Sequence, residues 1–186
     1  MTTVGEALVS CLEELQVAAA FGVVSIHNMP ILDALHRRGR IRFVTARGEA
    51  GAASMADAFA RVGGGLGALV TSTGTAAANA AGGLVEAAAA GTPLLHLTGQ
   101  IDSPYLDRDL GFLHEARDQP GMLKAISKAA FRIRRAEETF PMMQRAAGAA
   151  LTPPCGPVSV EVPIDVQQAA APRGRVDLLP AGKDQE

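Results

Sequence analysis

Short apolar segments alternate with helical patterns along almost the whole chain, and this alternation constrains the fold more than any other feature. The strand-like segments cover residues 17–24, 41–45, 66–72, 93–98, 129–133 and 157–162. The helical patterns cover residues 3–15, 29–38, 49–61, 75–90, 119–126 and 137–151. Strands separated by helices form right-handed crossovers, which give a parallel sheet with helices on both faces. The sequence therefore predicts an α/β fold, a three-layer sandwich of about six parallel strands that is doubly wound and flavodoxin-like.

Local signals support these elements and suggest where the domain ends. Thr3 and Glu6 have the spacing of a capping box, and Gly39 follows the helical pattern that ends at residue 38. The alanine-rich run 75–90 predicts one buried helix. We expect a single domain over residues 1–168 and a C-terminal tail or linker over residues 169–186, because the tail is rich in alanine, proline and charge.

Composition excludes several classes of partner. The formal net charge of −2 gives no electrostatic case for a nucleic-acid partner. No apolar run is long and uncharged enough to cross a bilayer, so we expect no membrane partner. The two cysteines, Cys11 and Cys155, are far apart in sequence, which argues against a disulfide framework or a zinc site and fits a cytoplasmic location. We expect no metal ligand in this chain.

Ligands of open parallel sheets bind at the carboxyl ends of the strands. Three loops should meet there, at residues 25–28, 46–49 and 72–75. Glu49 begins a helix of small and apolar residues, where the helix dipole favours a carboxylate and a dry site would let it share a proton with a ligand. The alternative is an ordinary helix N-terminal glutamate, paired with Arg47 or Arg61.

The turn at residues 72–75, followed by Asn79, is a second candidate. Its hydroxyl groups and free backbone amides are suited to a polar ligand, although ordinary helix capping uses the same residue types. His27 and His114 fall in loops near the same edge, so a role in substrate binding is open for both. His96 lies in an apolar strand, which is more typical of a buried structural histidine.

A series of motifs covers residues 3–168 in an order that resembles one known family. Arg47–Ala53 and the following Met55–Arg61 match its Arg-His-Glu-x-x-Ala and Met-Ala-Asp-Gly-Tyr-Ala-Arg pattern. Further matches lie at residues 21–35, 71–79, 93–100, 127–128 and 156–166. The chain thus resembles the N-terminal pyrimidine-binding (PYR) domain of thiamine-diphosphate enzymes of the acetolactate synthase type.

This resemblance implies roles for individual residues. Glu49 would be catalytic, because the family's carboxylate at this position bonds N1′ of the cofactor's aminopyrimidine and so activates the thiazolium for attack on a 2-keto acid. The residues expected to bind the pyrimidine end are Val24, Ser25, Glu49, Ser72, Thr73, Gly74, Thr75 and Asn79. The residues expected near the substrate are His27, Asn28, His114 and Lys128, with a plain surface lysine as the alternative for the last.

Some family features are changed or absent. Gly48 and Ala50 replace the usual His and Gln, and Thr73-Gly74-Thr75 replaces Gly-Pro-Gly, so the resemblance leaves the reaction open. The family's Gly-Asp-Gly motif, which holds the diphosphate and Mg²⁺, does not occur in this sequence. We therefore expect Mg²⁺ and the diphosphate to bind a separate diphosphate-binding (PP) domain, and this chain alone to be inactive. Whether FAD takes part stays open.

Three assignments follow from this resemblance. The chain is the PYR part of an acetolactate synthase-like enzyme, the alpha subunit of a split 2-keto acid decarboxylase, or a non-catalytic module that dimerises or regulates. An unrelated flavodoxin-like binding protein would require the ordered motifs to be coincidental. The helices that follow Ala46 and Gly74 carry few charges over several turns. Exposed, they would leave a large apolar patch, so we expect a homodimer to form through them.

Overall fold

A six-stranded parallel sheet forms the centre of the protein. The structure is a computed structural model that describes residues 2–63 and 65–177. The strands are β1 (Ala19–Gly22), β2 (Arg42–Thr45), β3 (Gly67–Thr71), β4 (Leu94–Gln100), β5 (Ala129–Arg132) and β6 (Pro157–Pro163), in the order β2-β1-β3-β4-β6-β5. All five pairs are parallel. The predicted doubly wound α/β sandwich is confirmed.

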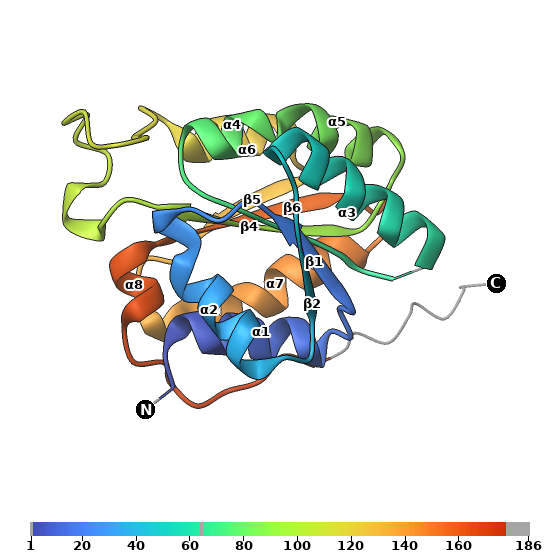
Figure 1. Ribbon diagram of the computed structural model, residues 1–186, viewed down its shortest axis with the longest axis horizontal. Helices are drawn as coiled ribbons and strands as arrows, with labels where there is room; N and C mark the ends of the chain where they lie inside the picture. Colours follow the sequence, from blue (N-terminus) through green and yellow to red (C-terminus); the bar gives the residue numbers. More distant parts are fainter. Residues whose placement is uncertain (1, 64, 178–186) are drawn as a thin grey trace.

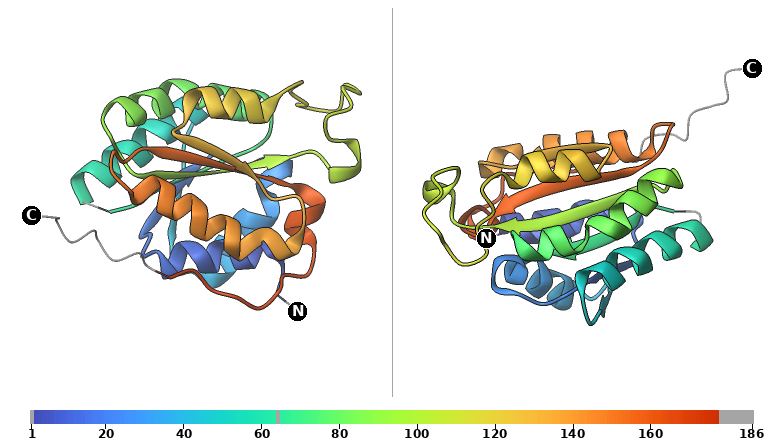
Figure 2. Two further views of the ribbon diagram at one scale, coloured as in Figure 1. Left: turned by 180° about the vertical axis from the view of Figure 1, so that it is seen from behind. Right: turned by 90° about the horizontal axis from the view of Figure 1, so that it is seen from above.

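Helices cover both faces of the sheet, as Figure 1 shows. One face carries α1 (Val4–Glu14), α2 (Met29–Arg38), α7 (Thr139–Leu151) and α8 (Ile164–Gln168). The other carries α3 (Glu49–Gly63), α4 (Thr75–Asn79), α5 (Ala81–Ala89) and α6 (Gln119–Ile126). Short 3-10 turns at Ile26–Asn28, Ser103–Tyr105 and Ala136–Glu138 complete the chain. The loop 101–118 projects from the carboxyl end of β4 (Figure 2).

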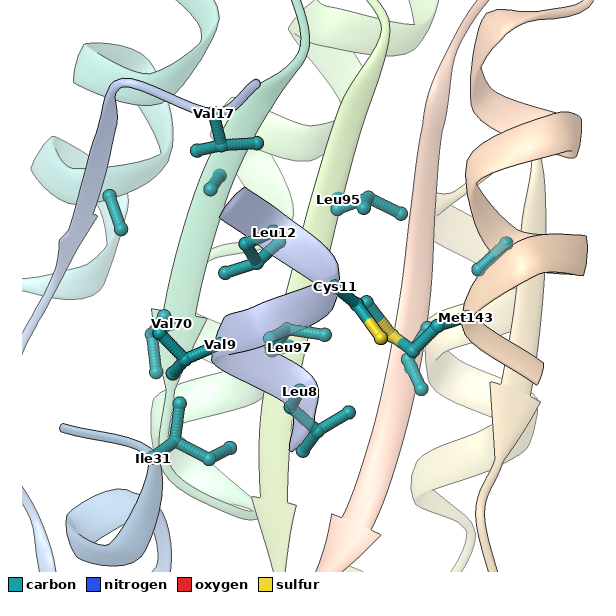
Figure 3. Packing of buried hydrophobic residues seen from close by; sticks show 14 of the residues in the cluster. Leu8, Val9, Cys11, Leu12, Val17, Ile31, Val70, Leu95, Leu97 and Met143 are labelled. Atoms are coloured by element: carbon teal, nitrogen blue, oxygen red, sulfur yellow. The ribbon is translucent and has the colours of Figure 1, made fainter. Parts of the chain in front are cut away.

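Each face of the sheet has its own apolar core. The larger core lies under α1, α2 and α7, where Leu8, Leu12, Leu97 and Met143 are completely buried together (Figure 3). The smaller core, under α3 and α5, relies on small side chains such as Ala53 and Ala56. A Cβ on Gly83 of α5 would lie 2.5 Å from the Ala53 Cβ, so a glycine there lets the two helices pack closely.

Several local predictions are confirmed. The Thr3 amide donates to Glu6 Oε2 at 2.8 Å and the Glu6 amide donates to Thr3 Oγ1 at 3.2 Å, which completes the capping box. Gly39 ends α2 with a left-handed φ of 64°, a conformation that glycine adopts without a steric penalty. Short-range hydrogen bonding of this kind depends on neighbours in sequence, which is why the sequence predicts it.

Two predictions need correction. The run 75–90 is interrupted at Ala80 and forms α4 and α5, and it is buried on one face only: Leu84 is completely buried, whereas Val85 is 48% exposed. The expected tail is partly structured: the Ala171 amide donates to the Thr2 carbonyl at 2.9 Å and the Val176 amide donates to Glu14 Oε2 at 2.7 Å. Residues 169–177 therefore pack on the domain, while residues 178–186 of the expected tail lie outside the described residues.

Among residues 2–63 and 65–177, none of the helices combines the length and apolar character that a bilayer crossing requires.

Candidate functional site

Glu49 is the first residue of α3, directly after the turn that leaves β2. It therefore lies at the carboxyl edge of the sheet, half-buried, at a helix N-terminus that favours a carboxylate. The Asn79 side-chain amide donates to Glu49 Oε2 at 3.2 Å. The alternative pairing of Glu49 with Arg61 is wrong, because Arg61 sits at the far end of α3 and bonds Asp57 Oδ2 at 2.6 Å.

The turn 72–75 leads directly into the short helix α4, whose last residue is Asn79. Thr75 begins α4, Asn79 ends it, and both are exposed. The structure thus brings three separately predicted features to the same edge of the sheet: the turn, Asn79 and Glu49.

Most of the turn 72–75 is less accessible to a ligand than expected. Ser72, Thr73 and Gly74 are buried. Thr73 Oγ1 lies 2.6 Å from Gln100 Oε1 and 2.9 Å from Gln119 Oε1. The Gly74 amide, expected to be free for a ligand, donates to Gln119 Oε1 at 2.5 Å. Thr75 is the one member of the turn that is exposed.

The loop after β1 supplies the next group. Val24 is exposed and Ser25 is half-buried, so both lie at the surface of the carboxyl edge. Asn28 is completely buried, accepts a hydrogen bond from the Ser25 amide at 2.9 Å and donates to the Val23 carbonyl at 2.9 Å. Its side chain shapes the loop and does not face an incoming substrate.

His27 and His114 come close although 87 residues separate them in sequence (114 minus 27). Their ring centroids are 6.4 Å apart, and His27 Nδ1 lies 3.4 Å from Ser72 Oγ. Burial, followed by the neighbouring His114, lowers the pKa of His27, which Asp102 only partly opposes. The His27 ring is therefore neutral near pH 7 and can donate one hydrogen bond and accept another.

Lys128 is not brought to this edge. It precedes β5 and so lies at the amino ends of the strands, opposite Glu49. Its ammonium donates to the carbonyls of Ala149 and Thr152 at 2.6 Å each, at the end of α7. These contacts favour the surface-lysine alternative, because a cation at a helix C-terminus complements the dipole.

Three buried polar residues near the turn, Gln100, Gln119 and Glu161, escape the sequence analysis as site residues, together with the half-buried Arg132. The sequence offers one sign of this cluster, because Glu161 is a carboxylate inside an otherwise apolar strand. A buried charge is almost always paired, so Glu161 predicts polar partners nearby. The buried structural role expected of His96 is confirmed, because its ring bonds Thr71 Oγ1 at 2.8 Å and Ser159 Oγ at 2.9 Å.

The donor set suits the pyrimidine end of the cofactor implied by the family resemblance. Asn79 holds one oxygen of Glu49, and small residues such as Gly48 leave open space beside it, where an added Cβ would meet nothing within 4 Å. A half-buried carboxylate of this kind can accept a hydrogen bond from a protonated ring nitrogen. Across the described part of the chain, no three His, Cys, Asp or Glu side chains gather so as to hold a metal ion.

Comparison with known proteins gives consistent matches. The family model of the thiamine pyrophosphate enzyme N-terminal TPP binding domain matches residues 2–122. A probable acetolactate synthase large subunit of Methanocaldococcus jannaschii is 32% identical over 173 residues, which are 93% of this chain and 28% of the relative. A probable 2-ketoarginine decarboxylase of Pseudomonas aeruginosa is 33% identical over 90% of this chain and 30% of its own length.

A solved structure agrees with these matches. The thiamine diphosphate-dependent 4-hydroxybenzoylformate decarboxylase of Rhodococcus jostii superposes with a TM-score of 0.84 at 26% identity, over 92% of this chain and 32% of that one. The chain spans about a third or less of the length of the proteins it matches. It belongs to the family of N-terminal TPP binding domains of thiamine pyrophosphate enzymes.

Proposed function

We propose that this chain is the PYR half of a thiamine-diphosphate enzyme that acts on 2-keto acids, with Glu49 as its catalytic residue. The observation that carries the proposal is the position of Glu49 at the first turn of α3, at the carboxyl edge of the sheet, with one oxygen held by Asn79. Family membership supplies the ligand class.

The residues of this chain have distinct tasks in the proposal. Glu49 shares a proton with the pyrimidine ring, and Asn79 keeps the carboxylate in one orientation. Thr75, Val24 and Ser25 line the edge of the site, while the neutral His27 and the exposed His114 stand beside it for the substrate. When bound, the cofactor supplies the carbon nucleophile that adds to the substrate carbonyl.

The relatives' lengths support a site completed from elsewhere. The matched proteins are about three times as long as this chain. We propose that a PP domain, in another chain or in a C-terminal region, brings Mg²⁺ and holds the diphosphate. The apolar side chains exposed at the carboxyl edge, Val24, Ile26 and Leu113, provide a surface for it. Without that domain, this chain is expected to be inactive.

A homodimer through α3 and α5 is part of the proposal. Gly51, Ser54 and Ala58 on α3 are exposed together with Gly82 and Val85 on α5, and small residues allow two copies to approach closely. Val85→Glu should shift the protein toward monomer in sedimentation equilibrium. The control is Met29→Glu, an exposed side chain on α2 across the sheet, which should leave the association unchanged. A wild-type protein that stays monomeric would remove this part of the proposal.

Calorimetry with thiamine diphosphate and Mg²⁺ tests the central assignment, with a candidate PP-domain chain as partner. Glu49→Gln should weaken cofactor binding about 10- to 100-fold, because it replaces a charge-assisted hydrogen bond. It should lower the rate with a 2-keto acid about 100-fold or more. The matched control is Glu137→Gln, an exposed carboxylate far from the site. Unchanged activity in Glu49→Gln, or cofactor binding that no partner restores, would favour the non-catalytic module instead.

A further inference from the structure

A cluster of buried polar side chains lies directly beneath the turn 72–75. Thr73, Gln100, Gln119 and Glu161 are each at most 2% exposed. They come from four parts of the chain: the turn after β3, the end of β4, the start of α6 and the middle of β6. Burying polar groups is costly unless every one is hydrogen-bonded. The arrangement is therefore specific, and the proposed function gives no role to Gln119 or Glu161.

Gln119 uses both ends of its amide in this cluster. Its oxygen accepts a hydrogen bond from the Gly74 amide at 2.5 Å and lies 2.9 Å from Thr73 Oγ1. Its nitrogen donates to the Gly99 carbonyl at 3.2 Å and to Glu161 Oε2 at 2.8 Å. A flipped amide would place its NH₂ group against the Gly74 N–H and its oxygen against two acceptors. The orientation of Gln119 is thus fixed by what surrounds it.

Among the neighbours of Gln119, the Glu161 carboxylate constrains the orientation of its amide most strongly. Its Oε2 also accepts a hydrogen bond from Gln100 at 3.3 Å, and its Oε1 accepts one from Arg132 Nε. The Arg132 guanidinium also bonds both oxygens of Asp107, at 2.9 and 2.8 Å, in the loop 101–118. A carboxylate accepts hydrogen bonds and donates none, so both glutamine NH₂ groups must point toward Glu161. The oxygen of Gln119 is consequently directed at the turn.

The turn itself has little freedom. Gly74 adopts φ 54° and ψ −107°, and a Cβ at this position would lie 1.7 Å from the His114 carbonyl oxygen. Its backbone is therefore pressed between the loop that carries His114 and the Gln119 side chain. One turn of helix, α4, then leads from Gly74 to Asn79, which bonds Glu49. A displacement of Gly74 is expected to reach Asn79, because only the residues of α4 join the two along the chain.

We propose that Glu161, acting through Gln119, is a positioning residue that sets the turn 72–75 and α4, and thereby the orientation of Glu49. The effect on the cofactor rests on the proposed function, whereas the effect on the turn does not. Neither residue needs to touch the cofactor, since the chain of contacts runs from Glu161 to Gln119, Gly74, Asn79 and Glu49.

Amide hydrogen exchange measured by NMR on this chain tests the first half. Glu161→Gln replaces one of two accepting oxygens by an NH₂ group, so either Arg132 or the two glutamine amides face a donor, and the orientation of Gln119 is held less firmly. The Gly74 amide should then exchange about tenfold faster, the change expected when one buried hydrogen bond is lost. Glu161→Asp keeps the charge and should restore most of the protection. Glu138→Gln, a surface carboxylate that bonds the Arg134 amide at 2.8 Å, should leave Gly74 unchanged.

Gln119→Met is the second variant, because it removes the hydrogen bond to Gly74 and leaves Glu161 with its charge and with its bonds to Arg132 and Gln100. It should accelerate Gly74 exchange to a similar extent, while amides within α7, across the sheet, stay protected. Gly74 exchange that is unaltered in Glu161→Gln and in Gln119→Met would overturn the inference, whatever the cofactor does.

Calorimetry with thiamine diphosphate, Mg²⁺ and the PP-domain partner tests the second half. Glu161→Gln and Gln119→Met should each weaken cofactor binding about tenfold, and the variant with the faster Gly74 exchange should bind more weakly. Glu161→Asp should bind the cofactor nearly as the wild type does. Faster exchange of the Gly74 amide with an unchanged affinity for thiamine diphosphate would overturn the proposed link from the turn to Glu49. Failure of the wild type to bind would instead overturn the proposed function, a result that the exchange data distinguish.

Discussion

His96 is expected to make this domain less stable as the pH falls below 6.5. The ring is completely buried in β4 between Thr71 and Ser159, and burial lowers its pKa from 6.5 to about 3. In the unfolded chain the same side chain takes up a proton near pH 6.5. The folded state therefore binds fewer protons over the window from 6.5 down to about 3, so stability is complete above this window and is lost as the pH falls through it.

The size of the effect follows from the two pKa values. Within the window, each pH unit lowers the free energy of unfolding by about 1.4 kcal/mol for one group. Between pH 7 and pH 5 the linkage relation gives a loss of about 2 kcal/mol. His27, whose pKa is also lowered, adds a loss of the same sign. Glu161 opposes it, since burial raises its pKa and its protonation favours the folded state.

Urea unfolding at pH 7, 6 and 5 isolates the contribution of His96 by difference. His96→Gln removes the titrating ring, while its amide can still bond Thr71, and His27 and Glu161 remain in both proteins. The wild type should lose about 2 kcal/mol more than the variant between pH 7 and 5. His36→Gln, which changes an exposed histidine on α2, serves as the control. Equal pH dependence in wild type and His96→Gln would refute this reasoning.

Two further changes test the structure. Gly74→Ala should lower the free energy of unfolding by about 3 kcal/mol, because its φ of 54° and the His114 carbonyl leave no room for a Cβ. Gly48→Ala, in open space, should change it by about 0.5 kcal/mol or less, and equal effects would contradict the close approach. Ellman's reagent should label Cys155 and spare Cys11 in the folded protein, since burial raises the pKa of Cys11 to about 12. Rapid labelling of both thiols without denaturant would contradict that burial.

The sequence predicts well those features that depend on neighbouring residues. The capping box of Thr3 and Glu6, the glycine that ends α2 and the alternation of strands and helices all arise from contacts within a few positions. The topological rule for parallel sheets then brings residues 46–49 and 72–75 to one edge. The same short-range reasoning fails for the run 75–90, which Ala80 divides into α4 and α5, both in contact with α3.

Features decided by long-range contacts were outside the reach of the sequence. Lys128 carries a plausible motif, yet it lies at the opposite edge from Glu49 and caps α7. Asn28 lies in the expected loop, but its side chain makes its hydrogen bonds to the backbone of that loop. In both cases the residue type suited the expected role, and the partner of the side chain was set only by three-dimensional packing.

The sequence by itself determined the fold class and the presence of Glu49 at the carboxyl edge of the sheet, because the alternation of strands and helices follows from local patterns. The tertiary structure alone decided how that edge is built. Gln119 and Glu161 lie 45 and 87 residues from Gly74 along the chain, by subtraction of their numbers. Only folding brings them beneath the turn, where a buried charge must find partners and therefore fixes the orientation of the groups around it.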